Sequence, residues 1–280
     1  MKILLTGADG QLGKEIQNLL FEDGIVIIPF SKKQLDITNR HQIKEVLNKY
    51  QPNVIINAAA FTKVDLCEVD VEKAYLVNAI GPFNLAFEAK QMNCKFVHIS
   101  TDYVFNGEKS TPYEVDDVTG PNTMYGKSKK VGEELVTAIN NESIIIRTSW
   151  LYGHSGDNFV KTMVNLSNKL DEIRVVNDQI GCPTYTKDLV LILKALLNEA
   201  PGIYHVTNIG KCSWYEFACE ILTFLDRKTK IIPVTTQEYG TKTPRPMYSV
   251  LSNKKLVDLQ ISQRDWKDAL YEFLRKEYAN

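Results

Sequence analysis

The sequence predicts a doubly wound α/β fold, in which helices cover both faces of a parallel sheet. Through the first 150 residues, short apolar segments alternate with segments of helical spacing. The apolar segments are near-continuous, which is typical of parallel strands buried on both faces. Strand–helix alternation of this kind favours right-handed crossovers within one sheet. The expected strands cover residues 2–6, 25–30, 54–58, 95–100 and 143–148, and the expected helices cover residues 11–23, 40–50, 68–92 and 125–140.

Each of the first elements carries its own local signal. Residues 2–6 are an apolar run, and residues 25–30 are rich in β-branched side chains, which favour strands. Between them, Leu12, Ile16 and Leu19 recur at the spacing of one helix face. The same apolar spacing marks the next helix, and the remaining strands are apolar almost throughout.

After residue 150 the regular alternation ends, and five prolines divide the rest of the chain into shorter elements. We therefore expect two domains, residues 1–150 and residues 151–280. The second is predicted to be a smaller α/β substrate-binding domain, with some segments returning to the first sheet. No linker-like composition marks the boundary. The expected helices here cover residues 159–168, 188–198, 214–225 and 265–278, and the expected strands cover residues 174–177 and 203–206.

Composition and charge exclude several classes of protein. The 280 residues carry 33 lysines and arginines against 34 aspartates and glutamates, a balance that favours neither nucleic acid nor an anionic membrane as a partner. No apolar stretch approaches the ~20 residues that span a bilayer, and polar residues interrupt the start too soon for a signal peptide. A cytoplasmic protein is expected. The five cysteines and four histidines form no metal-ligand pair, so neither a disulfide framework nor a metal site is predicted.

A glycine-rich loop follows the first strand. Gly7, Gly10 and Gly13 permit a tight turn, close approach to a pyrophosphate and packing of the helix on the sheet. The start of the following helix offers free N–H groups and a partial positive charge to phosphates. A glycine-rich turn without a ligand gives the same pattern, but its place between the first strand and the first helix favours a dinucleotide. The sequence thus predicts a Rossmann-type cofactor site.

Four side chains suited to carbonyl chemistry follow. Tyr125 and Lys129 lie four residues apart, on one face of the expected helix. A nearby ammonium favours the phenolate and tunes the phenol for proton exchange with a substrate oxygen. Thr101 and Asp102 end a strand, where ligands bind in parallel sheets. Taken alone, the Tyr125–Lys129 pair is better explained as an ordinary surface pair, and the residues after the strand as an ordinary turn. The prediction therefore rests on the glycine loop, the strand end and the Tyr–Lys pair occurring together in this order.

In this combination the sequence resembles the extended short-chain dehydrogenase/reductase family and, within it, the family of dTDP-4-dehydrorhamnose reductases. The resemblance covers essentially the whole chain. It implies NADPH-dependent reduction of the 4-keto group of dTDP-4-dehydro-L-rhamnose to dTDP-L-rhamnose, the last step towards a precursor of cell-surface polysaccharide. It is carried by the glycine loop and by motifs at residues 57–65, 100–105, 125–129, 147–153, 177–184 and 245–249.

The resemblance also implies a role for each matching residue. Tyr125 is the expected proton donor, Lys129 holds the nicotinamide ribose and lowers the pKa of the phenol, and Thr101 binds the keto oxygen. The expected substrate-binding residues are Thr101, Asp102, Tyr125, Trp150 and Arg245, the arginine gripping the diphosphate. A core tryptophan and a surface arginine are the alternative interpretations of the last two. The expected cofactor-binding residues are Gly7, Gly10, Gln11, Leu12, Gly13, Ser31, Lys32, Lys33, Asp36, Ile37, Ala58, Ala59, Ala60, Phe61, Thr62, Ile99, Tyr125 and Lys129.

The end of the second strand bears on the choice of cofactor. NAD-specific sheets carry an acidic residue there, which binds the ribose hydroxyls and repels a 2′-phosphate. Here Ser31, Lys32 and Lys33 follow the strand, and the first carboxylate is Asp36. A hydroxyl and two ammonium groups suit a phosphate dianion, so NADPH is predicted, with NADH also accepted. A solvated basic turn is the alternative.

The sequence leaves the oligomeric state and the type of reaction open. Some members of the resembled family dimerise through a magnesium ion held by acidic side chains, and Glu15 matches one such position. Lys187 stands where another acidic ligand is expected, so Mg²⁺ is not favoured, Glu15 is expected to be a solvated helix residue, and a homodimer stays open. A sugar-nucleotide epimerase or dehydratase with tightly bound NAD, and a non-catalytic regulatory subunit of the same fold, are the alternatives to a reductase.

Overall fold

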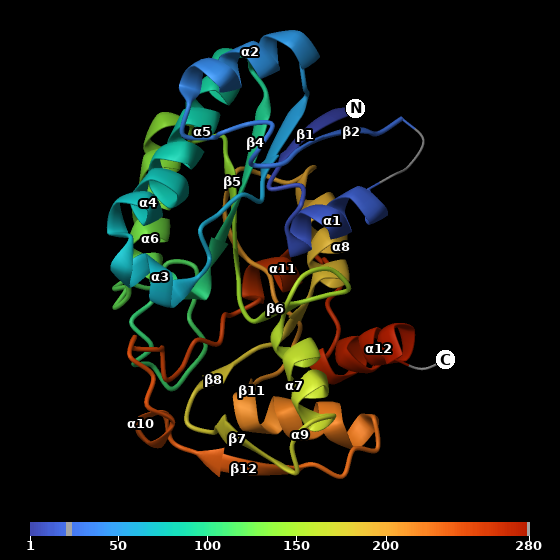
Figure 1. Ribbon diagram of the computed structural model, residues 1–280. Helices are drawn as coiled ribbons and strands as arrows, with labels where there is room; N and C mark the ends of the chain where they lie inside the picture. Colours follow the sequence, from blue (N-terminus) through green and yellow to red (C-terminus); the bar gives the residue numbers. More distant parts are fainter. Residues whose placement is uncertain (21–23, 279–280) are drawn as a thin grey trace.

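A computed structural model describes residues 1–20 and 24–278, and its centre is a parallel sheet of six strands (Figure 1). The strand order is β2-β1-β3-β4-β5-β10, so the order of the chain reverses between β1 and β3. In open sheets of this kind, ligands bind at the carboxyl ends of the strands beside such a reversal. The predicted doubly wound fold is confirmed. The strands are β1 (Lys2–Thr6), β2 (Val26–Phe30), β3 (Val54–Asn57), β4 (Lys95–Thr101), β5 (Ile144–Thr148) and β10 (Gly202–His205).

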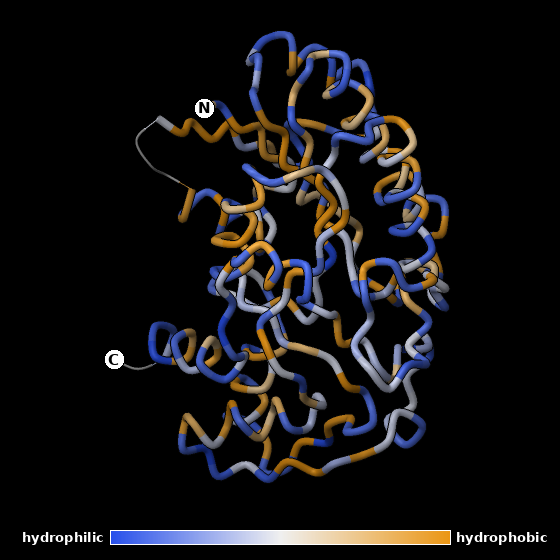
Figure 2. The backbone as a smooth tube through the Cα atoms, turned by 180° about the vertical axis from the view of Figure 1, so that it is seen from behind, coloured by the Kyte–Doolittle hydropathy of each residue, from blue (hydrophilic) through white to orange (hydrophobic). Residues whose placement is uncertain are grey.

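Helices cover both faces of this sheet because successive side chains of the central strands point to opposite sides. Ile3 and Leu5 face α1 and α8, whereas Leu4 between them faces α2 and α5. Figure 1 shows these two groups of helices on opposite sides of the strands, and Figure 2 shows the hydrophobic segments gathered in the strands. The helices of the two faces are α1 (Gln11–Leu19), α2 (Arg40–Tyr50), α5 (Gly81–Gln91), α6 (Met124–Ile139), α8 (Thr186–Leu196) and α11 (Lys254–Asp258).

Two of the expected helices differ from the structure. The first ends at Leu19, and residues 21–23 of the prediction lie outside the described residues. The long helix expected over residues 68–92 is wrong, because the chain forms three α-helical pieces and a π-helical turn. Asp70 caps a new helix by accepting a hydrogen bond from the Lys73 N–H, and Pro82 lacks the N–H that a continuous α-helix needs. The pieces before α5 are α3 (Val64–Val69), α4 (Val71–Tyr75) and η1 (Leu76–Ile80).

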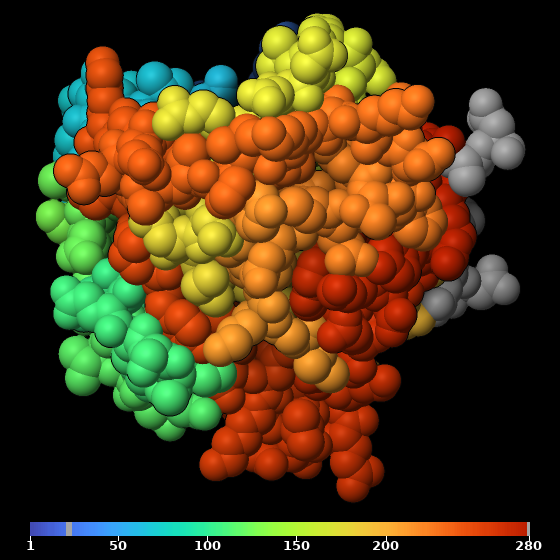
Figure 3. Space-filling model, turned by 90° about the horizontal axis from the view of Figure 1, so that it is seen from below, coloured from blue at the N-terminus to red at the C-terminus, as the bar shows by residue number. Residues whose placement is uncertain are grey.

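The second half of the chain forms most of a lower lobe with a core of its own. Its aromatic side chains interlock: Tyr152 stacks on Tyr185 with ring centroids 5.6 Å apart and meets Phe273 edge to face at 5.4 Å. Figure 3 shows that the lower face consists mostly of orange and red segments, which are C-terminal in the sequence. Three elements of this half leave the lobe: β10 extends the six-stranded sheet, α8 packs against α1, and α11 packs against β10.

Three two-stranded sheets give the lower lobe its frame. β7 pairs with β12 in parallel, β8 with β11 antiparallel, and β6 with β9 in parallel. Of these strands, only β7 was predicted from the sequence; β6, β8, β9, β11 and β12 were not. No helix in the described part of the chain is long and apolar enough to cross a membrane. The remaining elements are η2 (Asp102–Val104), β6 (Leu151–Tyr152), α7 (Phe159–Ser167), β7 (Glu172–Val176), β8 (Ile180–Gly181), β9 (Thr184–Tyr185), β11 (Cys212–Ser213), α9 (Trp214–Phe224), β12 (Lys230–Val234), α10 (Thr236–Tyr239) and α12 (Trp266–Tyr278).

Candidate active site

A cleft of about 450 Å³ opens at the carboxyl ends of β1, β3 and β4. A smaller recess of about 240 Å³ continues it towards β2, and Gly10, Ala58 and Ala60 line both. The two together follow the edge of the sheet where its order reverses. Residues of the main cleft that the sequence analysis selected are Gln11, Leu12, Gly13, Thr62, Ile99, Thr101, Asp102, Tyr125, Lys129 and Trp150.

The glycine loop is shaped by close backbone packing. Gly7 has φ +70°, and a Cβ there would lie 2.6 Å from the carbonyl carbon of Ala58. A Cβ on Gly13 would lie 2.2 Å from the carbonyl oxygen of Gly7. Helix α1 starts directly after Gly10, and no side chain caps its first N–H groups. These residues fit a dinucleotide pyrophosphate, because free N–H groups at a helix start bind anions.

The small recess ends at the loop after β2. Lys32, Asp36 and Ile37 line it, together with Gly7 and Ala59. The Asp36 carboxylate is engaged within its own turn, where Oδ1 accepts hydrogen bonds from the N–H and hydroxyl of Thr38 at 2.9 and 2.8 Å.

The other predicted residues of this region lie to the side of the recess. Ser31 donates a hydrogen bond from its hydroxyl to Gln34 Oε1 at 2.8 Å, and Lys33 is exposed. The ring of Phe61 lies under the Lys73 ammonium, 4.9 Å from it. These three therefore have no place in the lining of the recess.

Thr101, Asp102 and Tyr125 meet inside the main cleft. The Thr101 hydroxyl donates to Asp102 Oδ1 at 3.0 Å and is also the hydrogen-bonding neighbour of the Tyr125 phenol. Asp102 is buried, and burial raises its pKa to about 6 against the opposing hydrogen bonds from Ser249 and Thr101. The end of β4 and the start of α6 thus bring two hydroxyl groups and a carboxyl group together at one point.

Lys129 lies behind Tyr125, one turn further along α6. Its Nζ donates to the backbone oxygen of Ile99 at 2.6 Å, and burial lowers its pKa to about 8. Burial also raises the pKa of the Tyr125 phenol well above its usual value; the hydrogen bond from Thr101 opposes this shift and the Asp102 charge adds to it. Burial is the largest cause of this shift, and the lowering of the phenol pKa by Lys129 stays a prediction.

Trp150 lines the main cleft, and Arg245 lies beside Tyr103, which lines it as well. Trp150 lines the cleft in a left-handed conformation, with φ +46°, and stacks on Trp214 with ring centroids 3.5 Å apart. Backbone strain of this kind is concentrated at functional sites. Arg245 forms an ion pair with Asp65 at 2.8 Å and contacts the phenol of Tyr103, which lines the cleft. Nη1 of Arg245 is buried and has no partner among the described residues.

Asn78 is a site residue that the sequence analysis missed. It lies in the π-helical turn, completely buried, and its Oδ1 accepts from the Phe61 N–H at 2.8 Å. Its Nδ2 donates to the hydroxyl of Ser128 at 3.1 Å. Asn78 thus ties the loop after β3 to α6, the helix that carries Tyr125. The signal was hidden because a π-helical turn, a feature common at functional sites, has no sequence pattern of its own.

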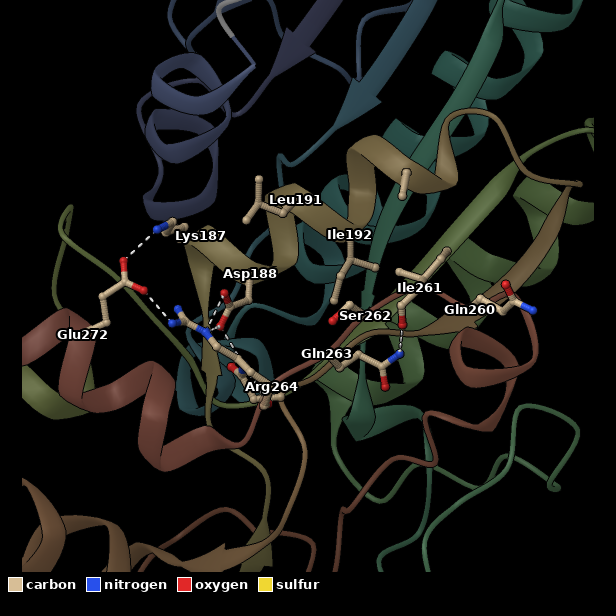
Figure 4. A pocket seen from close by; sticks show the side chains of 12 residues that line it. Lys187, Asp188, Leu191, Ile192, Gln260, Ile261, Ser262, Gln263, Arg264 and Glu272 are labelled. Atoms are coloured by element: carbon tan, nitrogen blue, oxygen red, sulfur yellow. Dashed lines mark hydrogen bonds and ion pairs between the residues drawn. The ribbon is translucent and has the colours of Figure 1, made fainter.

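The position expected for a shared magnesium ion lies near a different recess, of about 600 Å³, beside α8 (Figure 4). Lys187 forms an ion pair with Glu272 at 2.7 Å, and Glu272 also pairs with Arg264. Glu15 is buried and accepts a hydrogen bond from the Thr186 hydroxyl at 3.1 Å, so the expectation of a solvated residue is wrong. These residues do not fit a divalent cation, because an ammonium and a guanidinium occupy its surroundings. Within residues 1–20 and 24–278, no group of three His, Cys, Asp or Glu side chains could hold a metal ion.

The parallel sheet, the glycine loop at the start of α1 and the Tyr–Lys pair in the same cleft define a Rossmann-type short-chain dehydrogenase/reductase. More narrowly, the chain belongs to the family described as RmlD substrate binding domain, whose model matches residues 1–279. It is accordingly an NAD(P)H-dependent oxidoreductase.

Similar proteins cover almost the whole chain. The chain is 50% identical over 275 residues to the spore coat polysaccharide biosynthesis protein SpsK of Bacillus subtilis (strain 168), covering 98% of this chain and 97% of that protein. It is 41% identical over 286 residues to dTDP-4-dehydrorhamnose reductase of Aggregatibacter actinomycetemcomitans, covering 96% and 97%. A crystal structure of dTDP-4-dehydrorhamnose reductase from Bacillus anthracis str. Ames, in complex with NADP, matches with a TM-score of 0.96 at 42% identity, covering 98% and 99%.

Proposed function

We propose that this enzyme uses NADPH to reduce the 4-keto group of a dTDP-4-keto-6-deoxysugar, with dTDP-4-dehydro-L-rhamnose as the first candidate and dTDP-L-rhamnose as its product. The observation that carries the proposal is the meeting of Tyr125, Thr101 and Lys129 in a cleft continuous with the glycine loop. The relatives named dTDP-4-dehydrorhamnose reductases support the substrate class. The SpsK relative, named for spore coat polysaccharide, leaves the particular sugar to experiment.

Tyr125 and Thr101 would act on the keto oxygen. When bound, the reduced nicotinamide supplies a hydride to C4 of the sugar. As negative charge develops on the sugar oxygen, Tyr125 donates its phenolic proton to it and Thr101 stabilises it by a hydrogen bond. The high pKa of the buried phenol keeps Tyr125 protonated at neutral pH, in the state that a proton donor requires.

The two ends of the substrate would be held by different parts of the chain. Asp102, buried beside Thr101, accepts hydrogen bonds and suits a sugar hydroxyl. Trp150 offers the edge of a ring that Trp214 holds in place. Arg245 suits the diphosphate, because a guanidinium binds phosphate oxygens in a bidentate manner and its Nη1 has no partner among the described residues.

The preference for NADPH would be set at the end of β2. Lys32 lines the small recess, no carboxylate ends the strand, and a solved relative is in complex with NADP. The variant carrying Lys32→Ala is expected to raise KM for NADPH by about tenfold at low salt, as for an exposed charge-assisted contact. Lys33→Ala is the matched control, since Lys33 has no place in the recess. Equal KM values for NADPH and NADH in all three proteins would show that the basic turn is only solvated.

Two other functions fit the same scaffold. An epimerase or dehydratase keeps its NAD bound and requires no added reductant, whereas a reductase consumes one equivalent per turnover. A non-catalytic regulatory subunit would tolerate loss of Tyr125 and Lys129, and both are present here. The presence of the pair therefore favours catalysis.

The test is an assay of the purified protein with NADPH and a panel of nucleotide-linked 4-keto sugars. We expect loss of absorbance at the nicotinamide band with dTDP-4-dehydro-L-rhamnose, and one alcohol formed for each NADPH consumed. Turnover of a nucleotide sugar without any added reductant would identify an epimerase. Binding of cofactor without turnover of any sugar in the panel would favour the regulatory subunit.

A further inference from the structure

A row of buried polar side chains crosses the sheet beneath the cleft and ends on Lys129. The Thr6 hydroxyl donates to Asn57 Oδ1 at 2.7 Å. Asn57 Nδ2 lies 3.0 Å from His98 Nδ1, and His98 Nε2 lies 3.3 Å from Lys129 Nζ. All four residues are at most 1% exposed. Because these side chains are almost fully buried, their polar hydrogen atoms are expected to have partners within the protein.

The backbone fixes the direction of the row. The N–H of Ala59, which can only donate, points at Asn57 Oδ1 over 3.2 Å. The other atom of this amide is therefore the NH₂ group, and it faces His98 Nδ1. It follows that Nδ1 accepts a hydrogen bond and carries no proton.

The proton of His98 must then lie on the other ring nitrogen. Burial lowers the pKa of His98 well below its usual value, so the ring is neutral and carries one proton. That proton lies on Nε2, directly opposite Lys129 Nζ. An ammonium has three donors and no acceptor, whereas a neutral amine has a lone pair for the Nε2–H. The imidazole thus disfavours the charged form of Lys129.

We propose that His98 is a positioning residue for the reaction. Its Nε2–H donates a hydrogen bond to Lys129 Nζ in the neutral amine form and so favours that form over the ammonium. The inference rests on the proposed function, in which Lys129 and Tyr125 share the catalytic cleft. As an amine, Lys129 uses its lone pair for His98, one hydrogen for the Ile99 oxygen, and keeps one hydrogen for the cleft.

Other titratable groups surround Lys129 on α6 and after β4. On α6, Glu133 favours the ammonium, but its carboxylate is held by three hydrogen bonds from Arg147 at 2.7 to 3.2 Å. Tyr125 on the same helix is a protonated phenol. Asp102, at the end of β4, shares the cleft with Lys129. Burial lowers the Lys129 pKa to about 8, which brings the amine form within reach near neutral pH.

The first experiment measures the histidine itself in the wild-type protein, without cofactor or substrate. Two-bond ¹⁵N–¹³C correlation NMR distinguishes the two neutral tautomers of a histidine ring. We expect His98 to show the Nε2–H tautomer with no titration across neutral pH; the signal of His41, which is 80% exposed in its side chain, is the reference for a solvent-accessible ring. An Nδ1–H tautomer or an imidazolium at His98 would overturn the proposal.

The second experiment changes the donor into an acceptor. His98→Gln can present an amide oxygen to Lys129, and we expect its pKa, followed by ¹⁵Nζ or ¹³Cε NMR, to rise by about one unit or more, a tenfold change in proton affinity. His98→Phe removes the donor without adding an acceptor and should move the pKa less. His41→Gln is the control outside the site and should not move it. An unchanged Lys129 titration in folded His98→Gln contradicts the proposal.

The kinetic consequence separates this inference from the proposed function. In the reductase assay, His98→Gln should move the alkaline limb of the kcat profile upward by the same amount as the Lys129 pKa, with KM for NADPH nearly unchanged. If no sugar in the panel is reduced but the tautomer and the Lys129 shift are as expected, the proposed function fails and the inference on His98 stands. If reduction proceeds and His98→Gln leaves the Lys129 pKa unchanged, His98 has only a packing role and the proposal fails.

Discussion

The two halves of this molecule are held together by different interactions. In the first half, one parallel sheet buries its strands on both faces, and the cofactor loop is made almost wholly of backbone packed on backbone. In the second half, three two-stranded sheets surround an aromatic core, and ion pairs such as Arg264–Asp188 join segments 76 residues apart. The comparison indicates that local pattern specifies the first half, whereas contacts between distant side chains specify the second.

The largest expected effect is a loss of catalytic rate without a loss of stability. We predict that Tyr125→Phe lowers kcat by about 10²–10⁴, the usual range for a positioned proton donor. The free energy of unfolding should change little, since the aromatic ring stays in place. Steady-state kinetics and urea denaturation together check this, with Tyr239→Phe in the exposed α10 helix as the control that should change neither. Near-normal turnover of Tyr125→Phe would remove this residue from the mechanism.

The second prediction tests the backbone packing of the first half. Gly13→Ala would place a Cβ 2.2 Å from the Gly7 oxygen and 2.8 Å from the Ala8 Cα, neither of which can move freely. We expect a loss of about 3 kcal/mol in the free energy of unfolding, as for an overpacked site, and weaker cofactor binding. Gly120→Ala is the matched control, because its nearest neighbour would be 3.6 Å away. Calorimetry with NADPH and thermal unfolding measure both effects; equal behaviour of the two variants would contradict the interpretation.

The same comparison explains what the sequence could and could not predict. Gly7, Thr101 and Tyr125 were found because their chemistry shows in a few consecutive residues and in their order along the chain. Trp214, which holds Trp150, lies 64 residues away from it, and no local pattern relates the two. Strand β12 was missed for the same reason, since its partner β7 lies far earlier in the chain.

The burial of titratable groups could not be predicted from the sequence either. The pKa of Tyr125 is governed by desolvation, which depends on every element around it. Glu15 has the pattern of a solvated helix residue but is covered by α8, an element from the other half of the chain.

The third prediction concerns Asp102, which lies where the two halves of the chain meet. The first half contributes its carboxylate, and Ser249 of the second half forms a hydrogen bond with it. Its pKa of about 6 in the folded state lies above the ordinary value of 3.8 for this side chain. The folded protein therefore binds this proton more tightly, and stability falls as pH rises from about 4 through 6. We predict that Asp102→Asn is more stable than wild type at pH 7 by about 2 kcal/mol, with the difference vanishing towards pH 4. Urea denaturation over that pH range checks the sign, and a constant difference at all pH values would contradict it.

The smallest expected effect lies in the aromatic core of the second half, where two stacked tyrosines differ in one respect. The hydroxyl of Tyr152 is buried and has no hydrogen-bond partner among the described residues, whereas that of Tyr185 lies 2.6 Å from His154 Nε2. An unpaired buried hydroxyl is unfavourable, so Tyr152→Phe should stabilise the protein by about 1 kcal/mol. Tyr185→Phe should destabilise it by a similar amount, because His154 loses its partner. Urea denaturation of both variants at the same pH makes the comparison, and a matching loss in Tyr152→Phe would show that its hydroxyl is satisfied. The result would also separate packing from hydrogen bonding in this core, since both substitutions keep the ring and remove a single oxygen.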